Sequence, residues 1–373
     1  MVPKKIKLLI LSDQNSPHTY RWVRALSESG FEIFLFGLSE YDKDLYKGLA
    51  NISFYSVGIK QSVIKKKDGS LTKLSYLKAL FALQKIIRKF KPDILHAHYA
   101  TSYGLLGALS GFHPFIISVW GSDIYDFPQK SFLNRWIIKY NFYKADKILS
   151  TSNNMAFEVK KYTSKPVVIT PFGIDIEKFK PMEVESPFNK EDLVIGTVKG
   201  LEIQYGLEFL IRAFKILKEK YPEKALKLLI VGSGSKENDY KKLINELKLE
   251  NEVKFAGYIK PNKIPDYHNI IDIFVALSLL ESFGVSVLEA SSCEKPVVVS
   301  DAEGLKEIVE NNITGLIVPK SDLMKSVEAI EKLILSEELR NSLGKNGREK
   351  VLRDYNFSVC LDHMKNIYKK IVN

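Results

Sequence analysis

Cysteine is scarce in this sequence, and long apolar runs are missing. The 373 residues contain two cysteines, Cys293 and Cys360, which lie far apart and match no metal-binding spacing. This usage does not fit a disulfide-rich secreted protein and predicts a reducing, cytoplasmic compartment. No apolar run approaches the ~18 residues that a membrane-spanning helix needs. The start, MVPKKIKLLIL, has a short apolar run followed by Asp13 and no small-residue cleavage site, so we interpret it as a strand and not as a signal peptide.

A dinucleotide-binding fingerprint is also missing. The first predicted strand, residues 6–11, is followed by SDQNSPHTYRW, where a dehydrogenase would carry Gly-x-Gly-x-x-Gly. A later glycine turn, Gly232-Ser233-Gly234, lacks the third glycine. These absences argue against a nicotinamide-dependent dehydrogenase.

Acidic residues are few in the first half of the chain. Residues 1–175 carry 25 Lys and Arg against 13 Asp and Glu, whereas residues 176–373 carry 30 against 31. The excess is concentrated in Lys60–Lys91, where ten basic residues accompany one acidic residue. Such a segment is either an ordinary solvated surface or a contact for an anionic partner such as a membrane.

An amphipathic helix is predicted over residues 74–90, inside this basic segment. It could lie on an anionic bilayer, although packing on a sheet is the commoner role of such a helix. Its predicted apolar face consists of Leu74, Leu77, Phe81, Leu83, Ile86, Ile87 and Phe90.

The chain does contain a regular alternation of strands and helices. Its 45% hydrophobic and 27% charged residues are typical of a globular protein, and its length allows two domains. Short apolar runs predict strands at 6–11, 32–36, 92–98, 115–119, 147–150 and 167–170, and again at 193–198, 226–231, 253–255, 271–276, 297–299 and 316–318. Helices are predicted at 19–29, 74–90, 132–143, 154–162, 323–352 (broken near Ser336 and near Gly344–Gly347) and 359–371. This order predicts doubly wound α/β domains.

The most informative stretch is Glu281–Glu289, ESFGVSVLE, between two apolar strands. Glu281 is expected at a strand-to-helix turn, on the sheet edge where open α/β sheets bind ligands. A helix starting near Gly284 would offer N–H groups to a diphosphate, and we expect the glycine to leave room for phosphate or sugar. One carboxylate beside this turn can accept hydrogen bonds from sugar hydroxyls, and Glu289 on the helix can hold a nucleotide ribose.

The surrounding run resembles the donor-binding half of the retaining glycosyltransferases of family 4. The resemblance is carried by Glu-x7-Glu in a Glu-x-Phe-Gly frame, a small-residue helix, a Pro-Val-Val strand, Gly-x-x-Glu-x-Val and Gly-Leu-x-Val-Pro, all in order. It extends more loosely over the first half, where PFGID (171–175) is similar to the family's linker Pro-Asn-Gly-Val-Asp.

This resemblance implies an α/β fold of the GT-B type, with two doubly wound Rossmann-like domains facing across a cleft. Residues 1–171 with 356–373 would form the acceptor-side domain, and residues 172–355 the donor domain. The C-terminal helix would cross back to the first domain.

For the donor site, the resemblance implies a nucleoside-diphosphate sugar as substrate. Lys199, in a Lys-Gly pair after a strand, is assigned to the diphosphate, although the sequence departs from the family pattern at Thr197 and Tyr205. Glu281 would hold the sugar and Glu289 the ribose. The N–H groups of Phe283, Gly284 and Val285 would stabilise the leaving group. Gly232 would border the nucleotide, and Gly257 and Tyr258 would read the base. Retention of configuration is implied, with no cofactor and no metal.

The acceptor side offers three candidates for acceptor contact or proton transfer. His18 falls at a strand-to-helix turn, and Asp123 lies in the turn after strand 115–119, where Trp120 stands at a position often held by a family histidine. The end of strand 92–98 is expected to expose His96 or His98, and we select His98. Alternation sends both histidines to one face and Ala97 to the other.

We therefore predict a retaining hexosyltransferase that acts on a glycan or lipid-linked acceptor in cell-surface polysaccharide or glycolipid synthesis. The alternatives are a sugar-nucleotide epimerase of the same fold, which needs no acceptor, and a non-catalytic sugar-nucleotide or nucleic-acid binder. Nucleic-acid binding is not expected, because Lys60–Lys91 has only Tyr76, Phe81 and Phe90 as stacking aromatics. The protein is expected in the cytoplasm, with Lys60–Lys91 as its contact to the inner face of the cell membrane.

Overall fold

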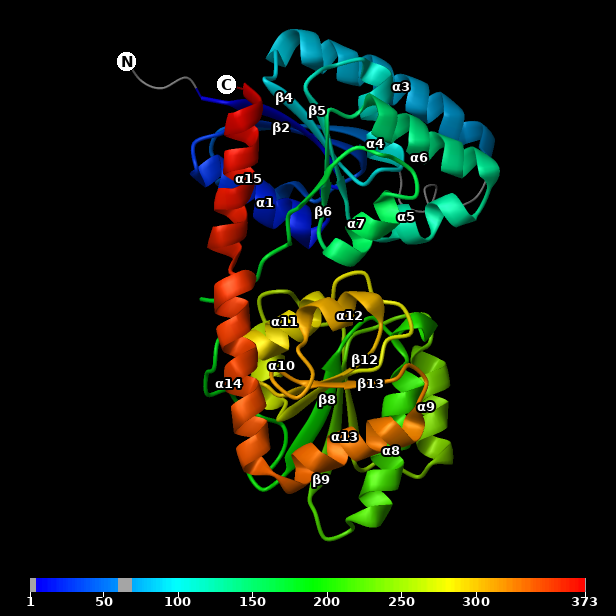
Figure 1. Cartoon of the computed structure of the whole chain (residues 1–373), viewed down its shortest axis with the longest axis vertical. Helices are drawn as coiled ribbons and strands as arrows, with labels where there is room; N and C mark the ends of the chain where they lie inside the picture. Colours follow the sequence, from blue (N-terminus) through cyan, green and yellow to red (C-terminus); the bar gives the residue numbers. More distant parts are fainter. Residues whose placement is uncertain (1–4, 60–68, 373) are drawn as a thin grey trace. The chain divides into compact units, whose positions relative to one another are not determined.

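The chain forms two compact units in the computed structural model, which describes residues 5–59 and 69–372 (Figure 1). Unit 1 contains the residues up to Phe172 and those from Cys360 onward, and unit 2 contains Gly173–Val359. The last helix, α15 (Phe357–Val372), therefore ends in unit 1. The hydroxyl of Tyr368 on α15 lies 2.7 Å from Nδ1 of His96, a strand residue of unit 1. The predicted return of the last helix to the first domain is confirmed.

Unit 1 is built on a seven-stranded parallel sheet with the order β3-β2-β1-β4-β5-β6-β7. Its strands are β1 (Lys7–Leu11), β2 (Glu32–Ser39), β3 (Ile52–Ile59), β4 (Ile94–His98), β5 (Phe115–Val119), β6 (Lys147–Ser150) and β7 (Val167–Ile169). Its other helices are α1 (Pro17–Glu28), η1 (Lys43–Tyr46), α3 (Gly69–Phe90), α4 (Ser102–Ser110), α5 (Ser122–Tyr125), η2 (Phe127–Gln129), α6 (Phe132–Lys144) and α7 (Asn153–Val159).

The two faces of this sheet are covered by different helices. Ala97 of β4 points into an apolar core shared with α3, α4 and α6, whereas His96 and His98 point to the opposite face, where His96 meets α15. Side chains alternate along a strand, so neighbours separate and residues two apart share a face. The prediction that both histidines share a face is confirmed, but neither is exposed, because α15 and the turn after β1 cover them.

Unit 2 is built on a six-stranded parallel sheet with the order β10-β9-β8-β11-β12-β13. Its strands are β8 (Leu193–Val198), β9 (Leu226–Val231), β10 (Val253–Gly257), β11 (Ile273–Ala276), β12 (Val297–Ser300) and β13 (Leu316–Val318). Its helices are η3 (Ile203–Tyr205), α8 (Leu207–Lys220), α9 (Glu237–Glu246), α10 (Ile264–Ile270), α11 (Val285–Ser292), α12 (Glu303–Ile308), α13 (Leu323–Leu335) and α14 (Glu337–Asp354). Helices α8, α9 and α13 bury their apolar sides in one core with the sheet.

Each sheet has one position where the chain order reverses. This switch lies between β1 and β4 in unit 1, and between β8 and β11 in unit 2. Connections leave the two central strands in opposite directions there, and the strand ends at this point form the usual ligand site of a doubly wound sheet. The candidate residues that follow β1, β4, β8 and β11 are therefore brought to these two edges.

Several predicted elements were wrong or incomplete. Strand β3 and the helices α4, α9, α10 and α12 were not predicted, although β3 shows the alternating burial of an edge strand. The break at Ser336 is confirmed, because its side chain caps α14, but α14 runs unbroken through Gly344 and Gly347. A Cβ on Gly344 would lie 2.1 Å from the carbonyl oxygen of Glu294. This glycine permits close packing of the helix and does not end it.

The predicted membrane-facing segment is described only in part. Residues 60–68 lie outside the described residues. Within the predicted apolar face of α3, Leu83 is fully buried, whereas Leu77 and Phe81 are 54% and 71% exposed, so this face is only partly packed on the sheet. The described ranges, 5–59 and 69–372, contain no helix that is both long and apolar enough to cross a membrane.

Candidate functional site

A lysine and a glutamate meet at the switch point of unit 2. Lys199 follows β8 directly, and Glu281 lies in the turn between β11 and α11. Their side chains form an ion pair and are only 13% and 11% exposed. They are 82 residues apart in the sequence and are brought together because β8 and β11 are neighbours in the sheet. The two residues that the resemblance assigns to the donor are thus in direct contact.

Two further side chains hold this pair. The ammonium of Lys199 lies 4.6 Å from the ring centroid of Tyr205 in η3, a cation–π distance. The hydroxyl of Ser278 donates to the carboxylate of Glu281 over 3.3 Å. Lys199, Tyr205 and the end of β11 also line a pocket of unit 2. Both charged groups are thus fixed in position beside a concave surface.

Gly284 opens α11 in the left-handed backbone region, with a φ of +94°. A Cβ there would lie 2.7 Å from Leu305 and from Ile308 of α12. The reason given for this glycine from the sequence, space for phosphate or sugar, was therefore wrong. The glycine is needed because α12 packs against the turn and because its φ is unfavourable for other residues.

Glu289 lies on the second turn of α11 and is 17% exposed. Its carboxylate lies 3.4 Å from Nε2 of His268 on α10, whose side chain is fully buried. This contact links Glu289 to a second helix and restricts the direction in which the carboxylate can point.

Glycines at the ends of β9 and β10 bring the neighbouring turns close to Lys199. Gly232 has a φ of +137°, and a Cβ on it would lie 1.8 Å from the carbonyl oxygen of Lys199. Its N–H donates to the carbonyl of Gly257 over 2.9 Å. Tyr258 follows with its side chain 72% exposed. Lys199, Gly232 and Gly257 thus lie on three consecutive strand ends of one sheet edge.

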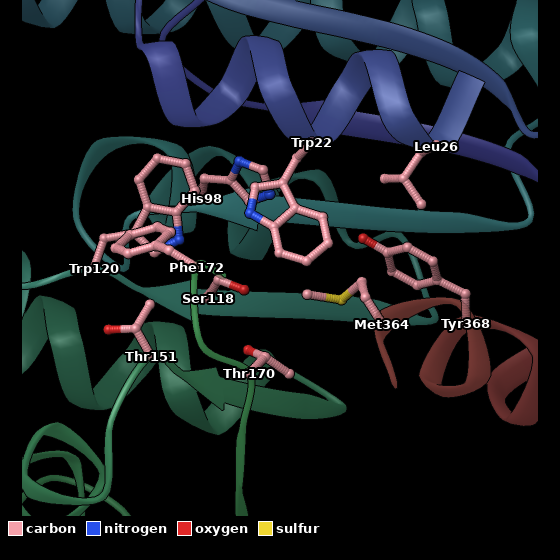
Figure 2. A pocket seen from close by; sticks show the side chains of 10 residues that line it. All are labelled: Trp22, Leu26, His98, Ser118, Trp120, Thr151, Thr170, Phe172, Met364 and Tyr368. Atoms are coloured by element: carbon pink, nitrogen blue, oxygen red, sulfur yellow. The ribbon is translucent and has the colours of Figure 1, made fainter. Parts of the chain in front are cut away.

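In unit 1, His98 lies at the corresponding edge beside a pocket. Figure 2 shows this pocket, lined by Trp22 and Leu26 of α1, Met364 and Tyr368 of α15, and His98, Ser118, Trp120, Thr151, Thr170 and Phe172. Nδ1 of His98 lies 3.1 Å from the hydroxyl of Ser12, the residue after β1. Burial lowers the pKa of His98 well below its ordinary value, and the neighbouring His96 lowers it further. His98 is therefore neutral at pH 7.

His18 belongs to an aromatic cluster at the same edge. Its ring is stacked on Phe172 at a centroid distance of 4.2 Å, and Trp120 contacts Phe172 at 5.2 Å and His98 at 4.5 Å. Burial, with a smaller contribution from Arg21, lowers the pKa of His18 to about 3. His18 is thus also neutral, and the cluster offers flat surfaces with two imidazole rings.

Asp123 is buried and tied to the backbone. Its carboxylate accepts hydrogen bonds from the N–H groups of Ala100 at 2.8 Å, Gly121 at 2.8 Å and Trp120 at 3.1 Å. Burial raises the pKa of this carboxyl, and the backbone donors act against that rise. Asp123 therefore joins the loop after β4 to the loop after β5, and this geometry fits a positioning role better than proton transfer.

The described parts of the chain contain no group of three His, Cys, Asp or Glu side chains arranged to hold a metal ion. One Asp-x-Asp sequence occurs, Asp42-Lys43-Asp44 on η1, where an Asp42 oxygen accepts the Asp44 N–H over 3.0 Å. Asp42 therefore acts as the N-cap of η1.

Three residues that contact the site were not selected from the sequence. Tyr205 was noted only as a departure from the family pattern, and Ser278 and His268 were not considered. No motif marks them, because each acts through a contact that the fold creates: the Lys199–Tyr205 contact, the Ser278–Glu281 hydrogen bond and the His268–Glu289 contact.

Two family models match the chain. "Glycosyl transferases group 1" matches residues 179–350 in unit 2, and "Glycosyl transferase 4-like" matches residues 7–152 in unit 1. Together they include Lys199, Glu281, Glu289, His18, His98 and Asp123.

Known proteins are similar over most of the chain. An uncharacterized glycosyltransferase of Methanocaldococcus jannaschii, MJ1059, is 31% identical over 313 residues, which is 75% of each chain. The UDP-Gal:alpha-D-GlcNAc-diphosphoundecaprenol alpha-1,3-galactosyltransferase of Escherichia coli is 26% identical over 318 residues, 79% of this chain and 80% of that protein. The structure of Anabaena HepE in complex with UDP and glucose aligns with a TM-score of 0.78 and 19% identity over 98% of this chain and 100% of that chain. This likeness and the two parallel sheets confirm the predicted GT-B type of fold.

Proposed function

The chain belongs to the group 1 glycosyltransferases, and on that premise we propose that it transfers a hexose from a nucleoside-diphosphate sugar to a glycan or lipid-linked acceptor, with retention of anomeric configuration. The observation that supports this most directly is the Lys199–Glu281 pair at the switch point of unit 2. One cation and one carboxylate at a strand-end edge match a donor that combines a diphosphate with sugar hydroxyls.

Donor binding exchanges the partners of this pair. Without the donor, the ammonium of Lys199 is neutralised by Glu281. A diphosphate carries more negative charge than one carboxylate and therefore competes for the lysine. The carboxylate of Glu281 is then available to accept hydrogen bonds from the sugar, with the Ser278 hydroxyl still beside it.

Leaving-group stabilisation is assigned to fixed positive charge. Negative charge develops on the nucleoside diphosphate as the bond between its terminal phosphate oxygen and the anomeric carbon of the sugar breaks. Lys199 and the N–H groups at the start of α11, from Phe283, Gly284 and Val285, supply positive charge and dipoles for it. We propose that no metal ion or cofactor is required, because the lysine carries the charge that a metal would otherwise supply. Activity that survives EDTA unchanged is the expected result.

The nucleotide is assigned to the neighbouring strand ends. Glu289, oriented by its contact with His268, holds the ribose hydroxyls. Gly232 lies against the Lys199 turn. We assign it to the border of the nucleotide, and Gly257 and Tyr258 to the base. The support for this assignment is the adjacency of β8, β9 and β10.

The acceptor is assigned to unit 1. His98 and His18 are neutral and suited to hydrogen bonds with sugar hydroxyls, and Asp123 positions the Trp120 loop beside them. The E. coli relative acts on a sugar carried by diphosphoundecaprenol, which supports a lipid-linked acceptor in cell-surface polysaccharide or glycolipid synthesis. The reaction is proposed to take place in the cytoplasm.

The donor site is tested by thermal shift with a panel of UDP-, GDP- and ADP-sugars. The matching donor should stabilise the wild type through mass action, by about 2.7 kcal/mol at a donor concentration of 100 times its Kd, and so raise its melting temperature. Lys199→Ala and Glu281→Ala should lose most of this increase and lose transfer of labelled sugar.

Matched controls are Lys325→Ala and Glu328→Ala, which remove an exposed ion pair of 2.8 Å on α13. Both controls should respond to the donor like the wild type. A Lys199→Ala variant that binds and transfers the sugar normally would show that the donor site lies elsewhere.

A further inference from the structure

The outer face of α6 in unit 1 is apolar although no described element covers it. Phe132 is 84% exposed, Leu133 63%, Trp136 54% and Tyr143 72%. The opposite side of the helix is buried in the core through Ile138 and Phe142. An α-helix with apolar side chains on both its inner and outer sides needs a second apolar environment for the outer side.

Three of the exposed side chains and the half-buried Tyr140 form one stripe. Phe132, Trp136, Tyr140 and Tyr143 are spaced by four, four and three residues, so they follow one another along one side of the helix. Trp136 and Tyr140 are stacked at 5.4 Å with an interplanar angle of 9°. The stripe is therefore an ordered aromatic surface and not a set of isolated side chains.

Positive charge surrounds this stripe. Residues 127–145 contain Lys130, Arg135, Lys139 and Lys144 and no acidic residue. The ammonium of Lys144 lies 5.8 Å from the ring centroids of both Tyr140 and Tyr143. Lys165 lies 5.9 Å from Tyr143 as well. Cations are thus held at the edge of the aromatic surface.

Aromatic residues with flanking lysines are the composition of a membrane–water interface. Trp and Tyr favour the headgroup level of a bilayer, and lysines and arginines are attracted to anionic lipids. Helices that lie in the plane of this interface direct Trp, Phe and Leu toward the lipid and keep Lys and Arg at the headgroups, and the outer side of α6 carries both kinds of residue. A protein partner would have to match the aromatic stripe and also provide acidic groups around it, whereas an anionic bilayer supplies both at once.

We propose that unit 1 docks on an anionic lipid bilayer through α6, with Phe132, Leu133, Trp136 and Tyr143 in the interface and Arg135 and Lys139 on the lipid headgroups. Helix α4 packs against both α6 and α3, and α3 exposes Leu77 and Phe81, with Lys78 and Lys85 exposed beside them. Exposed apolar side chains with flanking lysines are therefore present on a second helix as well. The surface includes part of the Lys60–Lys91 segment selected from the sequence and adds α6, which supplies most of the aromatic residues.

This inference deepens the proposed lipid-linked acceptor and rests on it for its biological meaning, but its experiment needs neither donor nor acceptor. The full-length chain is mixed with vesicles of 70% phosphatidylcholine and 30% phosphatidylglycerol, or of phosphatidylcholine alone, and binding is measured by co-sedimentation. Binding to the anionic vesicles is expected, with a decrease at high salt because the attraction of the cations is screened.

Phe132→Ser/Trp136→Ser should weaken the partition coefficient by about tenfold or more, since two large apolar groups no longer enter the interface. Arg135→Gln/Lys139→Gln should weaken it by about fivefold per cation. The matched control is Met324→Ser/Leu335→Ser on α13, where both side chains are 56% exposed, and it should bind like the wild type. Tryptophan emission should shift to shorter wavelength on binding, and Trp136→Phe should remove that shift while retaining binding, because Trp22 is already buried and Trp120 packs against His98 and Phe172, away from α6.

Equal binding by the wild type and the Phe132→Ser/Trp136→Ser variant would overturn the proposal, as would no preference for anionic lipid. A wild-type dimer that this variant converts to a monomer, with no vesicle binding by either, would assign the face to a second copy of the chain and would also overturn it. Transfer to a water-soluble acceptor should be retained in the variant, so failure of this proposal is distinguishable from failure of the proposed function.

Discussion

Replacement of Lys199 by methionine separates the catalytic from the structural role of the buried ion pair. Methionine keeps much of the length of the lysine side chain and removes its charge together with its N–H donors. In the wild type, the ammonium of Lys199 is paired with Glu281 and lies over the ring of Tyr205. Lys199→Met therefore leaves the carboxylate of Glu281 with Ser278 as its remaining partner.

The expected loss of stability is moderate. Removing one partner of a fully buried ion pair costs roughly 3–5 kcal/mol, because the other charge stays buried and unpaired. The two side chains here are still 13% and 11% exposed, so we expect a smaller loss, of about 2 kcal/mol. For a domain of this size, that corresponds to a decrease of about 4–8 °C in the melting temperature.

The expected loss of turnover is much larger. One fixed donor that stabilises developing negative charge contributes about 10²–10³ in kcat. Glu281→Gln should lower turnover as well, because its carboxylate no longer accepts hydrogen bonds from the sugar. In the double variant Lys199→Met/Glu281→Gln, no unpaired charge remains. Its free energy of unfolding should therefore return to within about 1 kcal/mol of the wild-type value.

Thermal unfolding and transfer of labelled sugar are measured on all four proteins of this cycle. The site assignment requires that turnover stays low in the double variant while its stability recovers. If turnover recovers together with the melting temperature, the pair acts through folding alone, and the assigned role of Lys199 is refuted.

Three further outcomes are expected. Gly284→Ala should lower the free energy of unfolding in urea by about 2 kcal/mol more than Gly257→Ala does. Both glycines have positive φ, but only at Gly284 would a Cβ meet other side chains. Equal losses of stability in the two variants would contradict this. Tyr368→Phe should cost about 1–3 kcal/mol by leaving buried His96 without one partner, and an unchanged stability would show that this hydrogen bond does not hold α15. Burial lowers the folded-state pKa of His96 from 6.5 to about 3, so its contribution to stability is complete above pH 6.5 and is lost as the pH falls toward 3. Unfolding free energies at pH 7.5, 6 and 5 should therefore decrease less in His96→Gln than in the wild type, and parallel decreases would assign the pH dependence to other groups.

The local sequence pattern was sufficient to predict most of the strands and to select the two glutamates Glu281 and Glu289. Strands such as β5, β8 and β9 have the predicted limits, because a short run of β-branched and apolar residues bounded by turns indicates a buried strand. The edge strand β3, the helices α4, α9, α10 and α12, and the unbroken helix through Gly344 were not recognised. In the last case the glycine suggested a helix end, whereas its actual requirement is the close approach of a distant loop.

The sequence alone determined the alternation of strands and helices, the two-domain plan and the motif that joins Glu281 to Glu289, since all of these are expressed in short stretches of chain. Only the tertiary structure decided what surrounds these residues. Strand order placed Lys199 against Glu281 over 82 residues of sequence, and the return of α15 placed Tyr368 on His96 over 272. Packing left the aromatic side of α6 uncovered and buried Asp123 among backbone donors. Contacts of this kind depend on which elements become neighbours, and a periodic pattern within one element carries no information about its neighbours.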